Sequence, residues 1–196
     1  MARCDVGHVW PILDAALREN GLPLRLRSDN GPPFATTGAG GLSRLAVQVI
    51  KAGVTPERIT PGKPQENGRH ERLHLTLLQD TANPPAATLL AQGLRFQRFR
   101  ASYNDERPHA ALDNATPDER YTASPRRWDG VLRSPEPEAG EATRRVKSNG
   151  LIRWGGLLVY VSEALDGEAV CLRRNRRGSL DGALRPPRPW PHRTGP

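Results

Sequence analysis

The chain reads RSDNGPPF at residues 27–34 and PGKPQENGRHER at residues 61–72. Residues 22–27, just before Asp29, alternate apolar and basic side chains, which is the period-two pattern of a short strand. The run Asp29-Asn30-Gly31-Pro32 then ends any regular structure, because Gly31 supplies a turn conformation that other residues resist. We therefore expect Asp29 at the carboxyl end of a strand, where ligands gather in α/β sheets.

The second stretch predicts a helix over residues 66–80. This run contains no proline and places Leu73, Leu77 and Leu78 at helical spacing. Glu71 then falls within the first two turns of that helix. Asp29 and Glu71 each present a carboxylate that is suited to holding a divalent metal ion.

Three ordered motifs, SDNGPPF, PGKPQENGRHER and FRASYNDERPHAALDNATPDERY (residues 99–121), resemble the catalytic core of DDE transposases of insertion sequences and of retroviral-type integrases. The resemblance spans roughly residues 8–170. It implies an α/β, ribonuclease-H-like integrase core, DNA transposition or integration as the activity, DNA as the partner, and a homo-oligomer as the active form.

The resemblance also implies two-metal phosphoryl transfer with Mg²⁺ or Mn²⁺ as the cofactor. In that chemistry one metal activates the attacking oxygen and the other stabilises the leaving oxygen. Asp29 and Glu71 are the expected catalytic residues and metal ligands. Glu66 is the alternative helical ligand, but the pattern PQ-x-x-G-x-x-E places the ligand at Glu71. Without the motif, Glu71 reads as a solvated helix residue that pairs with His74.

The family motif further implies contacts to DNA phosphates, which position DNA without specifying its sequence. The expected DNA-binding residues flank Glu71 or belong to the YN-x-x-RPH segment: Lys63, Asn67, Arg69, Arg72, His74 and Arg107. Asn67 and Gln65 have an alternative role, which is to cap the amides at the start of the helix. His109 is expected to pack within its segment rather than to bind metal.

Composition agrees with a polyanionic partner. The 196 residues contain 29 Lys and Arg against 21 Asp and Glu, a net charge of +8, and arginine in particular suits phosphate. A genome rich in arginine codons is the alternative explanation for the charge. Two distant cysteines, Cys4 and Cys171, form neither a disulfide framework nor a zinc motif. No signal peptide or membrane span is expected, which predicts a cytoplasmic protein.

The expected domains are residues 1–128, the C-terminal portion of an integrase core; 129–144, a linker; 145–181, a small β-barrel-like domain; and 182–196, a disordered tail. Further expected elements are helices at 8–20, 42–52 and 86–103, an extended segment at 54–59, and strands at 145–146, 150–154, 157–161 and 169–172. In the first helix, Val9, Ile12, Leu13, Ala16 and Leu17 form the expected apolar face.

The residues before Asp29 depart from the family pattern. A family core begins with a strand that bears the first catalytic aspartate, but Asp5 is the only acid before the first helix and no apolar strand precedes it. Asp5 resembles a residue in the loop that leads into this helix. We therefore expect a partial core that lacks its first strands and is catalytically inactive alone. The alternative is a non-catalytic DNA-binding remnant or a regulatory competitor of the full transposase.

Overall fold

The structure is a computed structural model that describes residues 5–36, 41–63, 65, 68–134 and 142–172. The chain divides into two compact units, which are described separately here: unit 1 comprises Met1–Ile59 and Ser124–Pro196, and unit 2 comprises Thr60–Ala123. The mixed α/β class is confirmed. The domain boundaries stay a prediction, and the tail at 182–196 and residues 135–141 of the expected linker lie outside the described residues.

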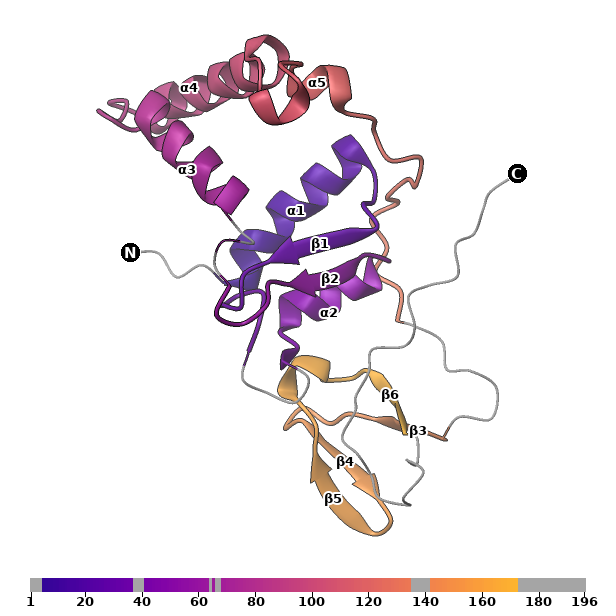
Figure 1. Cartoon of the computed structure of the whole chain (residues 1–196). Helices are drawn as coiled ribbons and strands as arrows, with labels where there is room; N and C mark the ends of the chain where they lie inside the picture. Colours follow the sequence, from indigo (N-terminus) through magenta and orange to yellow (C-terminus); the bar gives the residue numbers. More distant parts are fainter. Residues whose placement is uncertain (1–4, 37–40, 64, 66–67, 135–141, 173–196) are drawn as a thin grey trace. The chain divides into compact units, whose positions relative to one another are not determined.

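Unit 1 begins with a parallel strand pair connected through a helix (Figure 1). Strand β1 (Arg25–Ser28) pairs with β2 (Thr55–Arg58) in a register that aligns their first and last residues. Helix α2 (Arg44–Lys51) lies in the crossover, as a parallel pair requires. The predicted strand, helix and extended segment are therefore confirmed, although β1 begins three residues later than expected.

Helix α1 (Val6–Asn20) precedes β1 and begins at Asp5, whose side chain accepts a hydrogen bond from the His8 amide. This places Asp5 at the N-cap, directly before the helix into whose lead-in loop the sequence placed it, and the helix begins two residues earlier than expected. Leu13 and Leu17 pack against a buried cluster as predicted, but Ile12 is 70% exposed. Trp10, which the predicted face omitted, contacts the cluster instead because its large ring reaches Trp128 edge-on.

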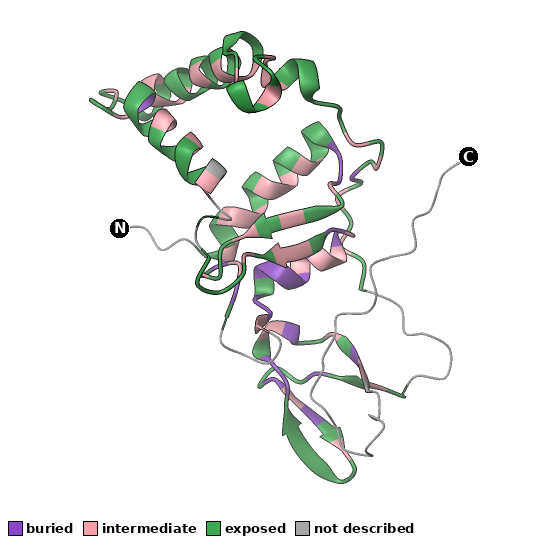
Figure 2. Cartoon of the chain, viewed as in Figure 1, coloured by how far each residue is buried: buried purple, intermediate pink, exposed green. Residues whose placement is uncertain are grey.

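Helix α2 carries two buried faces, which Figure 2 shows as its purple stretch. One face contributes Val49 to a cluster with Leu22, Val54 and Trp128. The other contributes residues to a cluster that extends into the C-terminal β segment; its buried members are Leu42, Ala46, Val47, Val146, Ile152, Val161, Leu165 and Val170. An amphipathic helix normally buries one stripe. Because α2 contributes residues to both clusters, it lies at the centre of the packing in unit 1.

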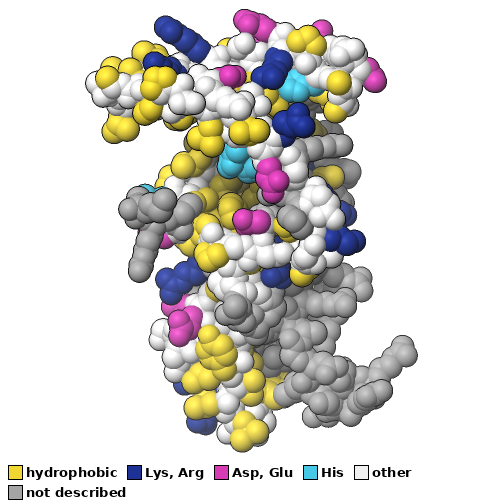
Figure 3. All heavy atoms as spheres, turned by 60° about the vertical axis from the view of Figure 1, so that its left-hand side comes forward, with side chains coloured by type: hydrophobic (Ala, Val, Ile, Leu, Met, Phe, Trp, Pro, Cys, Tyr) yellow, Lys and Arg dark blue, Asp and Glu magenta, His cyan; other side chains and the backbone are white. Residues whose placement is uncertain are grey.

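The C-terminal β segment consists of two antiparallel pairs. Strand β3 (Ala142–Arg145) pairs with β6 (Ala169–Leu172), and β4 (Leu151–Trp154) pairs with β5 (Leu157–Tyr160). A short 3₁₀ turn, η5 (Glu163–Leu165), connects β5 to β6. The strands predicted from residue 150 onward are confirmed. All four β5 residues are exposed, and their hydrophobic side chains are visible at the lower end of Figure 3.

Unit 2 is helical. It contains α3 (Gly68–Thr81), α4 (Leu89–Ala101), a π-helical turn η3 (Ser102–Glu106), a 3₁₀ turn η4 (Ala110–Leu112) and α5 (Pro117–Arg120). Thr81 is buried, and its carbonyl accepts a hydrogen bond from Gln92 of α4. Leu73 and Leu77 line a groove with aromatic residues of α4 as the spacing predicted, but Leu78 is 57% exposed.

No helix in the described part of the chain combines the length and apolar character needed to cross a bilayer.

Candidate functional site

Asp29 follows the last residue of β1, as the sequence predicted, and is exposed. One oxygen of its carboxylate, Oδ1, accepts a hydrogen bond of 3.2 Å from the Gly31 amide. The neighbouring Asn30 donates from its amide to the Ile59 carbonyl at 3.1 Å, just beyond β2. These two bonds fix the turn, so the ends of both strands hold the Asp29 carboxylate at one edge of the sheet.

Glu71 lies in the first turn of α3 within unit 2, and its side chain is exposed. An acidic residue in this position is favoured by the partial positive charge of the helix N-terminus. Within the described part of the chain, no hydrogen bond or ion pair engages its carboxylate, and the alternative pairing with His74 does not form. His74 lies instead against His70, with 3.1 Å between their Nε2 atoms. Glu66, the alternative to Glu71 as the helical metal ligand, lies outside the described residues.

The other expected DNA-contacting residues belong to unit 2. Lys63 is exposed in a turn before α3, and Arg72 and His74 are exposed on α3. Arg107 follows η3, with its guanidinium carbon 5.8 Å from the centre of the Tyr103 ring. The backbone of Arg69 belongs to α3; Asn67 lies outside the described residues.

The donor chemistry of Asp29 and Glu71 fits Mg²⁺ or Mn²⁺, which prefer carboxylate oxygen and retain several waters. At Asp29 the local geometry also fits. A side chain on Gly31 would begin 3.6 Å from both carboxylate oxygens, so glycine at that position keeps the approach to them open. Over the described ranges, no group of three His, Cys, Asp or Glu side chains is arranged to hold a metal ion.

Asp5 and His109, the two remaining candidates from the sequence, make local contacts. The Asp5 carboxylate lies 2.7 Å from Nδ1 of His8, and this hydrogen bond lowers the pKa of Asp5. The His109 ring packs edge-on against Tyr103, with 4.7 Å between the ring centres. Both residues therefore have structural contacts that do not require a metal.

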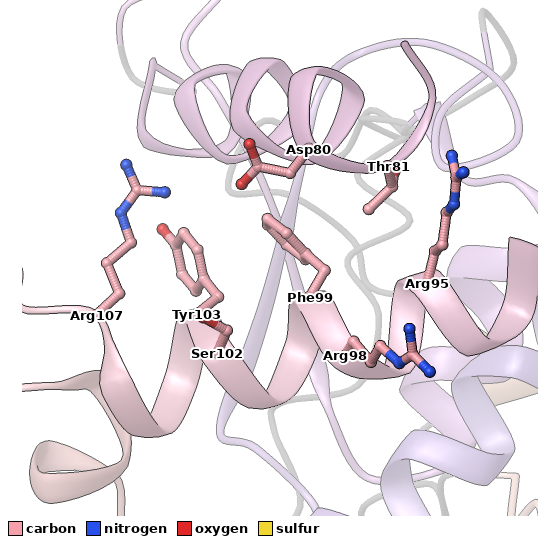
Figure 4. A pocket seen from close by; sticks show the side chains of 8 residues that line it. All are labelled: Asp80, Thr81, Arg95, Arg98, Phe99, Ser102, Tyr103 and Arg107. Carbon is pink, nitrogen blue, oxygen red and sulfur yellow. The ribbon is translucent and has the colours of Figure 1, made fainter. Parts of the chain in front are cut away.

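The sequence reasoning did not identify a pocket of about 320 Å³ in unit 2, formed by the end of α3 together with α4 and η3. Figure 4 shows Phe99 of α4 and Tyr103 of η3 extending toward the helix that carries Asp80, with Arg107, which follows η3, at one end of the pocket. Arg95 and Arg98 also line it. Their spacing of three residues on one predicted helix is the signal that was available in the sequence.

Comparison with known proteins supports the resemblance to integrases. Residues 52–117 match the family model described as the integrase core domain, a range that includes Glu71 and Arg107 but not Asp29. The chain is also 35% identical over 114 residues to an uncharacterized 31.7 kDa protein of insertion element IS407 from Burkholderia multivorans. The aligned region is 57% of this chain and 39% of that protein, so the chain spans about two fifths of its relative. The resemblance is thus confirmed: the chain contains integrase core sequence and is a homologue of an insertion-element protein.

Proposed function

We propose that this chain acts in DNA transposition by the two-metal phosphoryl transfer of DDE transposases. The observation that carries the proposal is the integrase core match, which contains Glu71 in the first turn of α3. The homology to an insertion-element protein supports the same conclusion. The parallel pair β1–β2 with α2 in its crossover is compatible with a ribonuclease-H-like core.

In this proposal Asp29 and Glu71 hold the divalent metals, which activate the attacking oxygen and stabilise the leaving one. The turn at Asn30 and Gly31 orients the Asp29 carboxylate and keeps side chains away from it. The residues proposed to bind backbone phosphates, and so to position the DNA strand, are Lys63, Asn67, Arg69, Arg72, His74 and Arg107. We further propose a cytoplasmic location and, as in the family, assembly as a homo-oligomer on paired DNA ends.

A second candidate function is DNA binding without catalysis, as a regulatory competitor of a complete transposase. The observation that favours it is the set of arginines around the unit 2 pocket. These arginines provide positive charge for DNA binding that requires neither Asp29 nor Glu71. Both functions require phosphate contacts, and only the first requires Asp29 and Glu71.

A nicking and strand-transfer assay with Mn²⁺ separates the two. The wild-type chain is compared with Asp29→Ala, Glu71→Ala and Glu66→Ala, and with Glu163→Ala as a control because Glu163 is an exposed acid of the C-terminal segment. The prediction from the sequence is that the chain alone is inactive; if the wild-type chain is active instead, the first two substitutions should abolish its activity and the other two should preserve it.

Activity that survives both Asp29→Ala and Glu71→Ala would refute the catalytic proposal. A folded wild-type chain that binds DNA but neither nicks nor joins it would support the second function instead. Far-ultraviolet circular dichroism of every variant confirms that lost activity is not lost folding.

A further inference from the structure

The unit 2 pocket is lined by three arginines and one carboxylate. Arg95 and Arg98 lie one turn apart on α4, and Arg107 comes directly after η3. Among the described residues that line it, Asp80, near the end of α3, is the only acid. The lining therefore carries a net positive charge.

The backbone places the third arginine at the opposite end of the pocket from the other two, with Tyr103 and Phe99 between them (Figure 4). Helix α4 continues into the π-helical turn η3, which closes with a 3.0 Å hydrogen bond from the Arg107 amide to the Ser102 carbonyl. Such turns often occur at functional sites because they redirect side chains within a helix. Here the turn directs the Arg107 side chain toward the pocket, beside Tyr103 (Figure 4).

Two of the three guanidinium groups have a fixed position. Arg95 donates from Nη1 to the Pro84 carbonyl at 2.7 Å, and Arg107 lies over the Tyr103 ring. Neither contact neutralises charge, and in the part of the chain that the structure describes no ion pair engages Arg95, Arg98 or Arg107. Like charges held around one cavity repel one another, and a bound anion relieves that repulsion.

We propose that this pocket binds phosphate groups of the DNA backbone, with Arg95 and Arg98 at one end and Arg107 at the other. The planar guanidinium fork matches phosphate oxygens and donates paired hydrogen bonds to them. The Ser102 side chain, also in the lining, provides a further polar group. The proposal rests on the proposed DNA function and extends it, since Arg95 and Arg98 were not among the residues expected to contact DNA.

The test measures binding of the full chain to a fluorescein-labelled DNA duplex by fluorescence anisotropy, from 50 to 200 mM salt. The variants are Arg98→Gln and Arg107→Gln, singly and together. Arg127→Gln is the matched control, because Arg127 is an exposed arginine of unit 1 and its loss changes the net charge equally. Each pocket substitution should weaken binding about tenfold. Each should also reduce the slope of log K against log salt by about one.

The outcomes separate this proposal from the broader one. A wild-type chain that does not bind the duplex would remove the proposed DNA function itself. Binding that keeps its affinity and salt slope in the double variant, as in Arg127→Gln, would overturn the pocket while leaving DNA binding intact. If the Gln variants do not fold, Arg98→Lys and Arg107→Lys replace them, because lysine keeps the charge but lacks the guanidinium fork. Weaker DNA binding with an unchanged salt slope then supports the proposal. Unchanged DNA binding overturns it.

A second measurement distinguishes DNA phosphate from free phosphate. Inorganic phosphate is titrated into the chain while the Nε–Hε resonances of Arg95, Arg98 and Arg107 are followed by NMR, and unlabelled duplex is then added. Displacement of the phosphate by the duplex supports a DNA-backbone site. Phosphate that the duplex does not displace would identify a small-anion site and overturn the proposal.

Discussion

Lys51 at the end of α2 forms a 2.6 Å ion pair with Glu168, which lies 117 positions later in the sequence and directly precedes β6. The two side chains are only 20% and 17% exposed. The second oxygen of Glu168 accepts a 2.6 Å hydrogen bond from the Ser134 hydroxyl. One carboxylate thus connects the crossover helix, the segment that follows unit 2 and the C-terminal β segment within unit 1.

This arrangement predicts that unit 1 loses stability when Glu168 is neutralised. Burial alone would raise the pKa of Glu168, but the hydrogen bonds from Lys51 and Ser134 outweigh it and lower that pKa. A lowered folded-state pKa stabilises the fold above the unfolded value of about 4.3, and this stabilisation is lost as the pH falls through the folded pKa. Glu168→Gln should therefore lower the free energy of unfolding at pH 7 by about 1–2 kcal/mol.

Urea unfolding at pH 7 and at pH 3 measures this effect. The difference between wild type and Glu168→Gln should be largest at pH 7 and should narrow at pH 3. Glu163→Gln, which neutralises an exposed acid close by, should change neither value. A difference that is the same at both pH values would show that the lost contact is not electrostatic.

Trp128 should also contribute to the free energy of unfolding of unit 1. Its side chain is buried, and its indole Nε1 donates a 2.7 Å hydrogen bond to Oδ1 of Asp14 in α1. Trp128→Ala removes both the packing and this bond, so the free energy of unfolding should fall by about 3–5 kcal/mol. Asp14→Asn retains an acceptor oxygen and should cost less than 1.5 kcal/mol, roughly the net worth of one hydrogen bond. Equal costs for both variants would contradict the packing role.

Gly150 and Gly156 provide a matched pair that separates steric clash from backbone strain. Both have positive φ angles, 74° and 81°. A Cβ on Gly150 would lie 2.8 Å from the Glu163 amide nitrogen, whereas a Cβ on Gly156 meets nothing within 4 Å. Gly156→Ala should cost about 1–2 kcal/mol from the φ angle alone, and Gly150→Ala should cost about 1–3 kcal/mol more. Thermal unfolding measures the loss of stability in both variants. Similar losses would show that the turn at Gly150, just before β4, can move away from Glu163 of η5 without loss of stability.

Local elements of this fold were predictable from the sequence, because periodicity and turn residues act over a few positions. The helix predicted over residues 42–52 is present as α2, and its apolar residues Leu45 and Val49 are buried. The bond between Trp128 and Asp14 and the packing of Ile152 with α2 were not predictable, since both join residues about one hundred positions apart and no local pattern encodes such pairings.

The candidate site likewise combines positions that the sequence predicted with a pocket that it did not. The motifs placed Asp29 after a strand and Glu71 at the start of a helix, and the structure has both there. The arginine pocket was missed because its third arginine, Arg107, follows the π-helical turn η3, which changes the spacing between it and the pair Arg95 and Arg98. Helical spacing of 3.6 residues predicts which side chains share a face, but it fails where one turn is wider.

Calorimetric titration of the folded chain with Mn²⁺ tests the central claim most directly, since it requires no DNA. The variants are Asp29→Asn, Glu71→Gln and Glu66→Gln, which remove one negative charge each with little change in shape. Mn²⁺ binding should weaken at least about tenfold in the first two variants and should be unchanged in the third. If Asp29→Asn retained the wild-type Mn²⁺ affinity, the assignment of Asp29 as a metal-binding carboxylate would be contradicted. If Glu66→Gln lost Mn²⁺ affinity and Glu71→Gln did not, the assignment of Glu71 would be contradicted.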